Sequence, residues 1–311
     1  MNSESIQSAE MLETDAGVMP DAAELSTMNY SGHTHNTAPT RFAQVGEVQF
    51  AYRRFGNPVG TPIVLLQHLM GNLDNYDPAV TDGLAAGREV ILTDNAGVGR
   101  STGAAPDTVA AMARDAASLI DALGLERVDL FGFSMGGFVA QQIAIDRPEL
   151  VRRLILVGTG PRGGDDMGQL DPDVAPLFAK VYDPQDLMWL PIFFSPSNES
   201  QAAGRRFLER IRARIADRDV AVSQATVAAH LAAARDWGAA TPSSFDYLKE
   251  IPRPALVANG SHDIVVPTVN SFTLQQNLPN AELILFPDSN HGSHFQFPDV
   301  FNRYATDFLD R

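Results

Sequence analysis

The sequence predicts an α/β fold in which a mostly parallel sheet carries helices on both faces. Short apolar runs and amphipathic stretches alternate along most of the 311 residues, which is typical of strand–helix–strand units. The alternation stops between about residues 163 and 250, where helical periods continue without a clear strand. We therefore expect one α/β domain, formed by residues 41–162 and 251–311, with a helical insertion at 163–250.

The expected strands are of two kinds. The first, Val48–Arg54, alternates between apolar and polar residues, as a half-buried strand does. The later runs are almost continuously apolar, which favours strands covered on both faces. These runs are Pro62–Gln67, Glu89–Asp94, Val128–Phe133, Leu154–Val157, Ala255–Ala258 and Leu283–Phe286.

The expected helices lie between these runs, where apolar residues recur at helical spacing. In the α/β domain they are Thr108–Leu123, Gly137–Arg147, Thr268–Leu278 and Ser293–Leu309. In the insertion the strongest periods are Ala202–Ala216 and Val220–Trp237. The first of these two is crowded with arginines, and we interpret that run as a solvated face.

Residues 1–40 differ from the rest of the chain. They hold acidic residues but no lysine or arginine, and no apolar period is sustained. This composition predicts a disordered tail, in which His33 and His35 are exposed. The segment has neither the basic start nor the apolar run of a secretory signal, so we expect a cytoplasmic protein.

Composition excludes several classes of function. Lys plus Arg total 23 and Asp plus Glu total 38, a net charge of −15, which argues against nucleic acid as a partner. The absence of cysteine excludes thiolate metal sites, iron–sulfur clusters and a cysteine nucleophile. Apolar runs such as Ile63–Leu66 are far too short to span a bilayer. We expect a small-molecule substrate and no cofactor or metal, and the oligomeric state stays open.

The strongest chemical signal is the stretch Gly132-Phe133-Ser134-Met135-Gly136. It joins an expected buried strand to an expected helix, which is the context of a G-x-S-x-G nucleophile elbow. The flanking glycines permit a sharp turn that lifts the Ser134 hydroxyl above the sheet. The alternative interpretation is a glycine-rich turn whose serine only caps the helix.

A serine nucleophile needs a histidine base, and that base needs an orienting carboxylate. In a doubly wound sheet both come from loops at the carboxyl ends of later strands. Asp263 follows the strand Ala255–Ala258, and His291 follows Leu283–Phe286. The competing candidates are His262, His294 and Asp288.

The tetrahedral intermediate also needs two backbone donors. We expect one from Met135, directly after the nucleophile, and the other from Met70 in the loop after Pro62–Gln67. His68 in the same loop has two possible roles, as a catalytic group or as a residue that pins the loop, and we favour the second.

With these elements in order, residues 41–311 resemble the α/β-hydrolase fold family, in its Ser-His-Asp branch with a helical cap. The resemblance implies a mostly parallel eight-stranded sheet with the cap, residues 163–250, inserted after the sixth strand. It differs at His68-Leu69, where many relatives have His-Gly. The matching motifs are Gly132–Gly137, Asp94–Ser101, Gly260–Asp263 and His291–Gln296.

The resulting hypothesis is a serine hydrolase that cleaves an ester, thioester or lactone of a small to medium apolar acid. Alternatives are a C–C bond hydrolase, a cofactor-free perhydrolase or haloperoxidase-like enzyme, and a non-catalytic receptor on the same fold. Apolar residues of the cap and the oxyanion loop are the expected pocket: His68, Leu69, Trp189, Phe193, Phe194 and Trp237.

Overall fold

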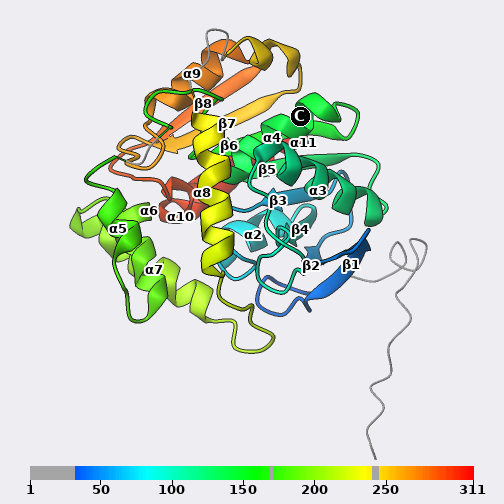
Figure 1. Cartoon of the computed structure of the whole chain (residues 1–311), viewed down its shortest axis with the longest axis horizontal. Helices are drawn as coiled ribbons and strands as arrows, with labels where there is room; N and C mark the ends of the chain where they lie inside the picture. The colour runs from blue at the N-terminus through cyan, green and yellow to red at the C-terminus, as the bar shows by residue number, and fades with distance from the viewer. Residues whose placement is uncertain (1–31, 169–170, 240–244) are drawn as a thin grey trace, which may run out of the picture.

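The computed structural model describes residues 32–168, 171–239 and 245–311, which form an eight-stranded sheet covered by helices (Figure 1). The strand order is β1-β2-β4-β3-β5-β6-β7-β8. The two pairings that involve β2 are antiparallel and all others are parallel, as predicted. The strands are β1 (Arg41–Val45), β2 (Val48–Gly56), β3 (Ile63–Leu66), β4 (Glu89–Thr93), β5 (Val128–Phe133), β6 (Val151–Val157), β7 (Ala255–Gly260) and β8 (Ala281–Phe286).

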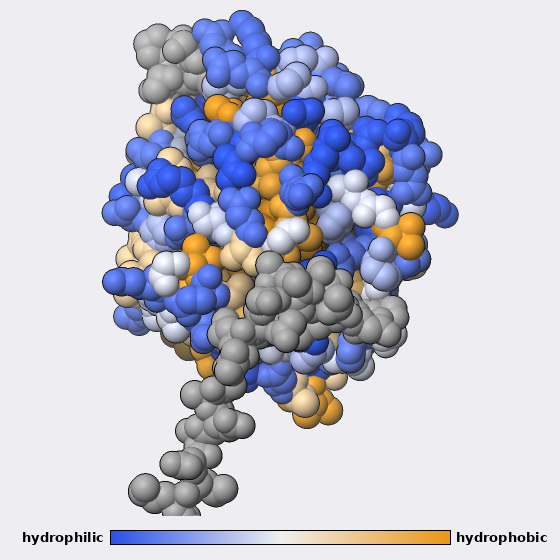
Figure 2. Space-filling model, turned by 90° about the vertical axis from the view of Figure 1, so that its right-hand side faces the viewer, coloured by the Kyte–Doolittle hydropathy of each residue, from blue (hydrophilic) through white to orange (hydrophobic). Residues whose placement is uncertain are grey.

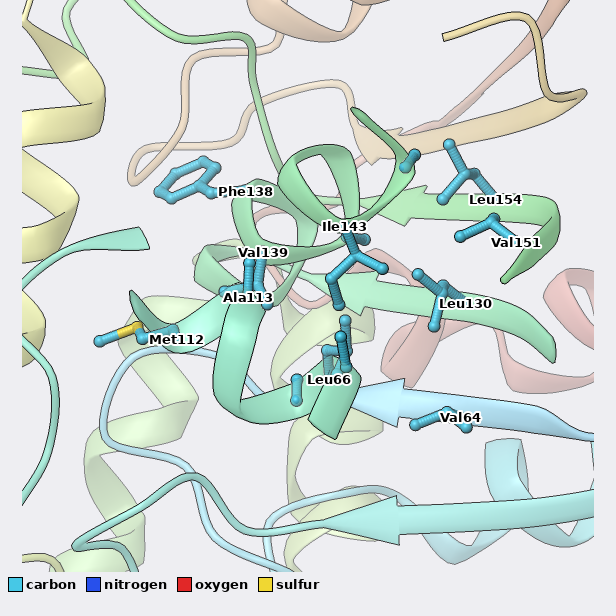
Figure 3. Close-up of a cluster of buried hydrophobic side chains, with 14 of the residues drawn as sticks. Val64, Leu66, Met112, Ala113, Leu130, Phe138, Val139, Ile143, Val151 and Leu154 are labelled. Atoms are coloured by element: carbon cyan, nitrogen blue, oxygen red, sulfur yellow. The ribbon is translucent and has the colours of Figure 1, made fainter. Parts of the chain in front are cut away.

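The central strands are buried on both faces, which explains their continuous apolar sequences. In β3, Ile63 and Leu65 belong to one apolar cluster, whereas Val64 and Leu66 belong to the other. Successive side chains of a strand point to opposite faces, so one run of four apolar residues serves two cores. Figure 3 shows the second core, where Ile143 lies over Leu66 and Leu130.

The helices of the α/β domain divide between the two faces. Residues of α3 (Val109–Ala122), α4 (Met135–Asp146) and α9 (Val269–Asn277) pack on one face, and residues of α2 (Pro78–Ala85) and α11 (Pro298–Asp310) on the other. The helix α2 was not predicted, because eight residues are too few to show a clear helical period. Its start is nonetheless marked by Asp77, which accepts a hydrogen bond from Ala79 N–H, and by Pro78 in the first turn.

The prediction of one helix at Ser293–Leu309 is wrong in one respect, because the structure has two helices there. The short α10 (Ser293–Gln296) ends before Phe297, and α11 starts at Pro298. Proline has no N–H to donate and restricts the residue before it, so Phe297 leaves the helical conformation with ψ of 53°.

Helices fill the described part of the segment between β6 and β7, and it contains no strand. They are α5 (Ala175–Ala179), η1 (Gln185–Met188), α6 (Trp189–Phe193), α7 (Asn198–Arg212), α8 (Gln224–Gly238) and η2 (Asp246–Glu250). Each of the two long helices, α7 and α8, begins after a serine whose side chain accepts a hydrogen bond from the first turn. In Figure 1, α8 crosses in front of the sheet, and α5 and α7 lie together to one side.

The expected exposure of the arginine run is wrong for two of its members. Arg210 donates to both carboxylate oxygens of the buried Asp77, with Nε at 2.7 Å from Oδ1. Arg214 is only 4% exposed and donates to the carbonyl oxygens of His35 and Asn36. The guanidinium groups of Arg210 and Arg214 therefore attach the helical segment to the α/β domain.

The predicted tail, residues 1–40, is described only from residue 32 onward. Its end is not exposed as expected, because His35 is 1% exposed and its Nδ1 lies 2.9 Å from Oγ1 of Thr81 on α2. His35 N–H also donates to Asp82. The sequence pattern did not predict this contact, because hydrogen bonds form it and no apolar period marks it.

The burial of His35 should make the stability of the protein sensitive to acid. Desolvation lowers its pKa to about 3, whereas an unfolded histidine titrates near 6.5. The unfolded chain therefore binds one more proton between these values, and the free energy of unfolding falls as pH drops below about 6.5. We expect the loss of stability between pH 7 and 5 to be about 2 kcal/mol smaller in His35→Leu than in wild type.

Urea unfolding at the two pH values measures this difference. Val80→Ala, in the neighbouring helix, is the control, because it removes buried apolar surface without removing a histidine. It should lower stability by the same amount at both pH values. An equal pH dependence of the free energy of unfolding in His35→Leu and wild type would contradict the lowered pKa of His35.

None of the helices in the described ranges is long and apolar enough to cross a membrane. Figure 2 shows one face of the molecule, on which hydrophilic residues predominate and smaller hydrophobic areas lie between them.

Candidate active site

Ser134 lies at the sharp turn from β5 to α4. Its φ of 54° and ψ of −120° are unusual for a residue with a side chain. The turn needs glycine nearby, because a Cβ at position 136 would overlap the carbonyl oxygen of Leu66, and one at position 132 would overlap that of Gly136. The carbonyl of Ser134 accepts a hydrogen bond of 2.8 Å from Thr159 Oγ1, which fixes the strained residue.

The structure brings Ser134, His291 and Asp263 together. Nε2 of His291 lies 2.9 Å from Oγ of Ser134, and its Nδ1 lies 2.8 Å from Oδ2 of Asp263. All three are less than 8% exposed. Because Oδ2 accepts a hydrogen bond from Nδ1–H, Nε2 carries the lone pair and can accept a hydrogen bond from the serine hydroxyl. This is the geometry in which a histidine takes a proton from a serine nucleophile.

Backbone amides orient the carboxylate of Asp263. Its Oδ1 accepts hydrogen bonds from the N–H groups of Val265 and Val266, at 2.8 and 3.0 Å. The Oδ1 of Asn290 accepts from the N–H of Ile264 and also from that of His291. One amide side chain thus joins the loop that carries the acid to the loop that carries the base.

The other three candidates, His294, Asp288 and His262, form no hydrogen bond with Ser134. His294 is fully buried among aromatic rings, including Phe131 and Phe301, and burial holds its pKa well below the usual value. Asp288 accepts from the hydroxyls of Ser195 and Ser197, which lowers its pKa. His262 is exposed and contacts Ser261.

The two expected oxyanion donors have different surroundings. Met135 is the first residue of α4, where the backbone N–H has no partner within the helix, and it lines the cavity beside Ser134. Met70 does not fit its predicted role. Its N–H donates to Nδ1 of His230 at 3.4 Å, and it is not among the residues that line the cavity. Its φ of 66° turns the loop away from an ordinary extended path.

Ser134 and His291 open on a cavity of about 650 Å³. Of the expected pocket residues, His68, Leu69, Trp189 and Phe193 line it. The sequence reasoning missed other lining residues, most of which are apolar and come from segments without a clear motif. They include Phe138, Met167, Phe178, Ile192, Leu231, Ala234, Val265 and Val266.

Two expected pocket residues pack the protein interior instead. Trp237 stacks on Phe138 with ring centres 5.4 Å apart, and its indole N–H donates to the carbonyl oxygen of Gly160. Phe194 packs against Phe207 of α7. Both rings are almost fully buried and neither lines the cavity.

The turn Asp94–Ser101 holds the loop that precedes α2, in line with a structural role. Oδ1 of Asp94 accepts a hydrogen bond from Leu73 N–H at 2.9 Å. Oγ of Ser101 donates to the carbonyl oxygen of Asp94 and accepts from Ala51 N–H.

A mostly parallel sheet with a serine at the strand–helix turn, and with acid and base at later strand ends, defines an α/β hydrolase. The chain belongs to this family, since the model of the α/β hydrolase fold family matches residues 61–298. The protein is therefore a member of a family of hydrolases.

Known relatives cover nearly the whole chain. An α/β hydrolase fold protein from Chitinophaga pinensis is 40% identical, with a TM-score of 0.84 over 89% of this chain and 99% of that one. A 2-hydroxy-6-oxononadienedioate/2-hydroxy-6-oxononatrienedioate hydrolase from Burkholderia vietnamiensis is 32% identical over 90% of this chain and 98% of its own. RutD from Rhizobium rhizogenes, whose name proposes a carbamate hydrolase, is 29% identical over 84% and 97%.

Proposed function

We propose that the protein is a serine hydrolase that cleaves an ester, thioester or lactone of a small to medium apolar acid. One observation carries the proposal: the Ser134–His291–Asp263 chain of hydrogen bonds opens on a largely apolar cavity of about 650 Å³. A cavity of this kind favours an apolar acyl group over a highly charged one.

The geometry supports a two-step mechanism. Ser134 Oγ attacks the carbonyl carbon while its proton passes to Nε2 of His291, and Asp263 stabilises the imidazolium. The tetrahedral intermediate then collapses, and the leaving alcohol or thiol takes the proton from His291. Water attacks the acyl-enzyme in the second step, His291 accepts its proton, and the acid leaves as Ser134 Oγ recovers the proton.

Two backbone donors stabilise the oxyanion in this proposal. Met135 N–H is the first, as expected from the sequence. Leu69 replaces Met70 as the second, because Leu69 lines the cavity and no described residue accepts a hydrogen bond from its N–H. The first residue of α4 and the loop that follows β3 then supply the two N–H groups to the reacting carbonyl.

C–C bond hydrolysis is the second candidate, and two of the named relatives support it. Besides the Burkholderia vietnamiensis protein, a 2-hydroxy-6-oxo-6-phenylhexa-2,4-dienoate hydrolase from Burkholderia cepacia is 28% identical over 77% of this chain. Another solved relative, described as an N-acyl homoserine lactone degrading enzyme, supports ester-type chemistry instead. It is 25% identical over 86% of this chain, with a TM-score of 0.66.

A substrate panel separates the two candidates. We expect kcat/KM for p-nitrophenyl esters to rise from acetate to medium-chain acids as the acyl group fills the cavity. We expect 2-hydroxy-6-oxo-6-phenylhexa-2,4-dienoate to be a much poorer substrate, since the cavity wall is mostly apolar and its arginine, Arg235, is exposed to solvent, where an ion pair with a carboxylate contributes little. Turnover of the dienoate without turnover of any ester would contradict the proposal.

A further inference from the structure

Asp288 is a carboxylate close to the active site that the proposed mechanism does not use. It lies three residues before His291, in the loop between β8 and α10, and it is exposed to solvent. Its φ of 44° is in the left-handed region, which residues other than glycine, asparagine and aspartate rarely adopt. Residues in such conformations are held by their surroundings and cluster at functional sites. The contacts that hold Asp288 therefore point to a role in function.

Two serines of the helical segment bind the carboxylate of Asp288. Oγ of Ser195 donates to Oδ1 at 2.6 Å, and Oγ of Ser197 donates to Oδ2. These hydrogen bonds favour the ionised carboxylate and lower its pKa. Ser195 is 5% exposed and lies two residues after the end of α6. The carboxylate thus attaches the start of the catalytic loop, residues 287–292, to the chain that follows α6.

The helix α6 also contacts the catalytic loop on both sides of His291, and in Figure 1 it lies beside α10, which follows the loop. The N–H of Gly292 donates to the carbonyl oxygen of Phe193 at 2.9 Å. Nδ2 of Asn290 lies 3.4 Å from the carbonyl oxygen of Pro191. The rings of Phe193 and His291 are in contact, with centres 6.1 Å apart. The position of His291 therefore depends on how the loop is attached to the helical segment.

Catalysis depends on the position of His291 in both steps of the proposed mechanism. Nε2 must be within hydrogen-bond reach of Ser134 Oγ, which lies 2.9 Å away, and later within reach of the attacking water. Asp263 orients the ring through Nδ1, whereas the loop backbone determines where the whole ring lies. A displacement of about 1 Å can cost about 100-fold in rate. Contacts that hold the loop therefore act on catalysis through His291.

We propose that Asp288 is a positioning residue, which holds His291 within reach of Ser134 by attaching the catalytic loop to the helical segment. Asp288 is not among the residues that line the cavity, so it acts through His291 and not on the substrate. This inference rests on the proposed serine hydrolase function. It gives the helical segment a part in positioning the base, in addition to its part in the cavity wall.

The kinetics of Asp288→Ala with p-nitrophenyl butyrate test the inference. Because both chemical steps use His291, its displacement should slow acylation and deacylation alike. We expect kcat to fall by about 10-fold while KM stays within about twofold of wild type. Thermal unfolding should change little, because Asp288 is exposed. A purely structural role would instead raise KM through a displaced cavity wall, or lower the melting temperature alone.

Further variants assign the loss of kcat to the contact with Ser195. Asp288→Asn tolerates the left-handed backbone and keeps an acceptor, so kcat should be within about threefold of wild type. Ser195→Ala removes a donor without changing residue 288, and kcat should fall here too, again with KM unchanged. The double variant should lose no more than the larger single loss, because both changes remove the same interaction. Glu282→Ala is the control and should keep the wild-type kcat, since it removes an exposed carboxylate that pairs with Arg311.

The outcomes separate this inference from the proposed function. The inference is overturned if Asp288→Ala and Ser195→Ala both keep the wild-type kcat, if KM rises while kcat is unchanged, or if the losses in the double variant are additive. Ser134-dependent hydrolysis still supports the proposed function in each of these cases. If replacing Ser134 leaves the hydrolysis of every ester unchanged, the proposed function fails and the inference fails with it.

Discussion

Ser134→Ala is expected to lower kcat for p-nitrophenyl butyrate by about 10⁴-fold or more, since loss of a triad member removes the acyl-enzyme route. The fold should be unaffected. The Oγ atom makes its hydrogen bond to His291, whereas the strained backbone of residue 134 is held by Val157 and Thr159. Steady-state kinetics and thermal unfolding of the same preparation measure the two effects.

Ser289→Ala is the matched control for this experiment. Ser289 is also buried, in the loop that leads to His291, and its Oγ has no partner among the described residues. Its replacement should leave kcat within about threefold of wild type. Residual activity above one per cent in Ser134→Ala would contradict the assigned nucleophile.

Asp74→Asn is expected to lower the free energy of unfolding by about 3–5 kcal/mol. Asp74 and Arg53 are both almost fully buried, and Arg53 Nη1 lies 2.7 Å from Oδ1 of Asp74. The other oxygen, Oδ2, accepts from Asp219 N–H at 2.8 Å, and Arg214 is buried nearby. Loss of the carboxylate charge would leave the buried Arg53 without this carboxylate partner and Arg214 with its ion pair to Asp217 alone.

Asp121→Asn is the control, because Asp121 pairs with Arg147 on the surface and its side chain is 49% exposed. An exposed pair of this kind contributes about 1 kcal/mol at most. Urea unfolding of both variants at pH 7 compares the two costs. Equal costs would contradict the view that the buried Arg53–Asp74 ion pair contributes more to stability than an exposed pair does.

The sequence predicts seven of the eight strands, all but β1, and the closeness of Ser134, Asp263 and His291, for a shared physical reason. Strands covered on both faces must be continuously apolar, so their ends are easy to find. In a parallel sheet, the loops at those ends meet at one edge. Asp263 and His291 could therefore be placed next to Ser134 from chain order alone.

The cavity wall and the hydrogen bond of Met70 N–H could not be predicted in this way. Trp237 and Phe138 stack on each other because of how α8 crosses the sheet, and no local pattern encodes that crossing. Met70 N–H bonds to His230, which is 160 residues away in sequence. The burial of His35 likewise depends on a distant threonine, Thr81.

Labelling with a fluorophosphonate probe tests the central claim, that Ser134 is an activated nucleophile, most directly. We expect one adduct per wild-type chain, mapped by mass spectrometry to the peptide that contains Ser134, and complete loss of ester hydrolysis as labelling proceeds. Ser134→Ala should take up no label. An adduct on a different residue, or ester hydrolysis that continues in the fully labelled protein, would contradict the claim.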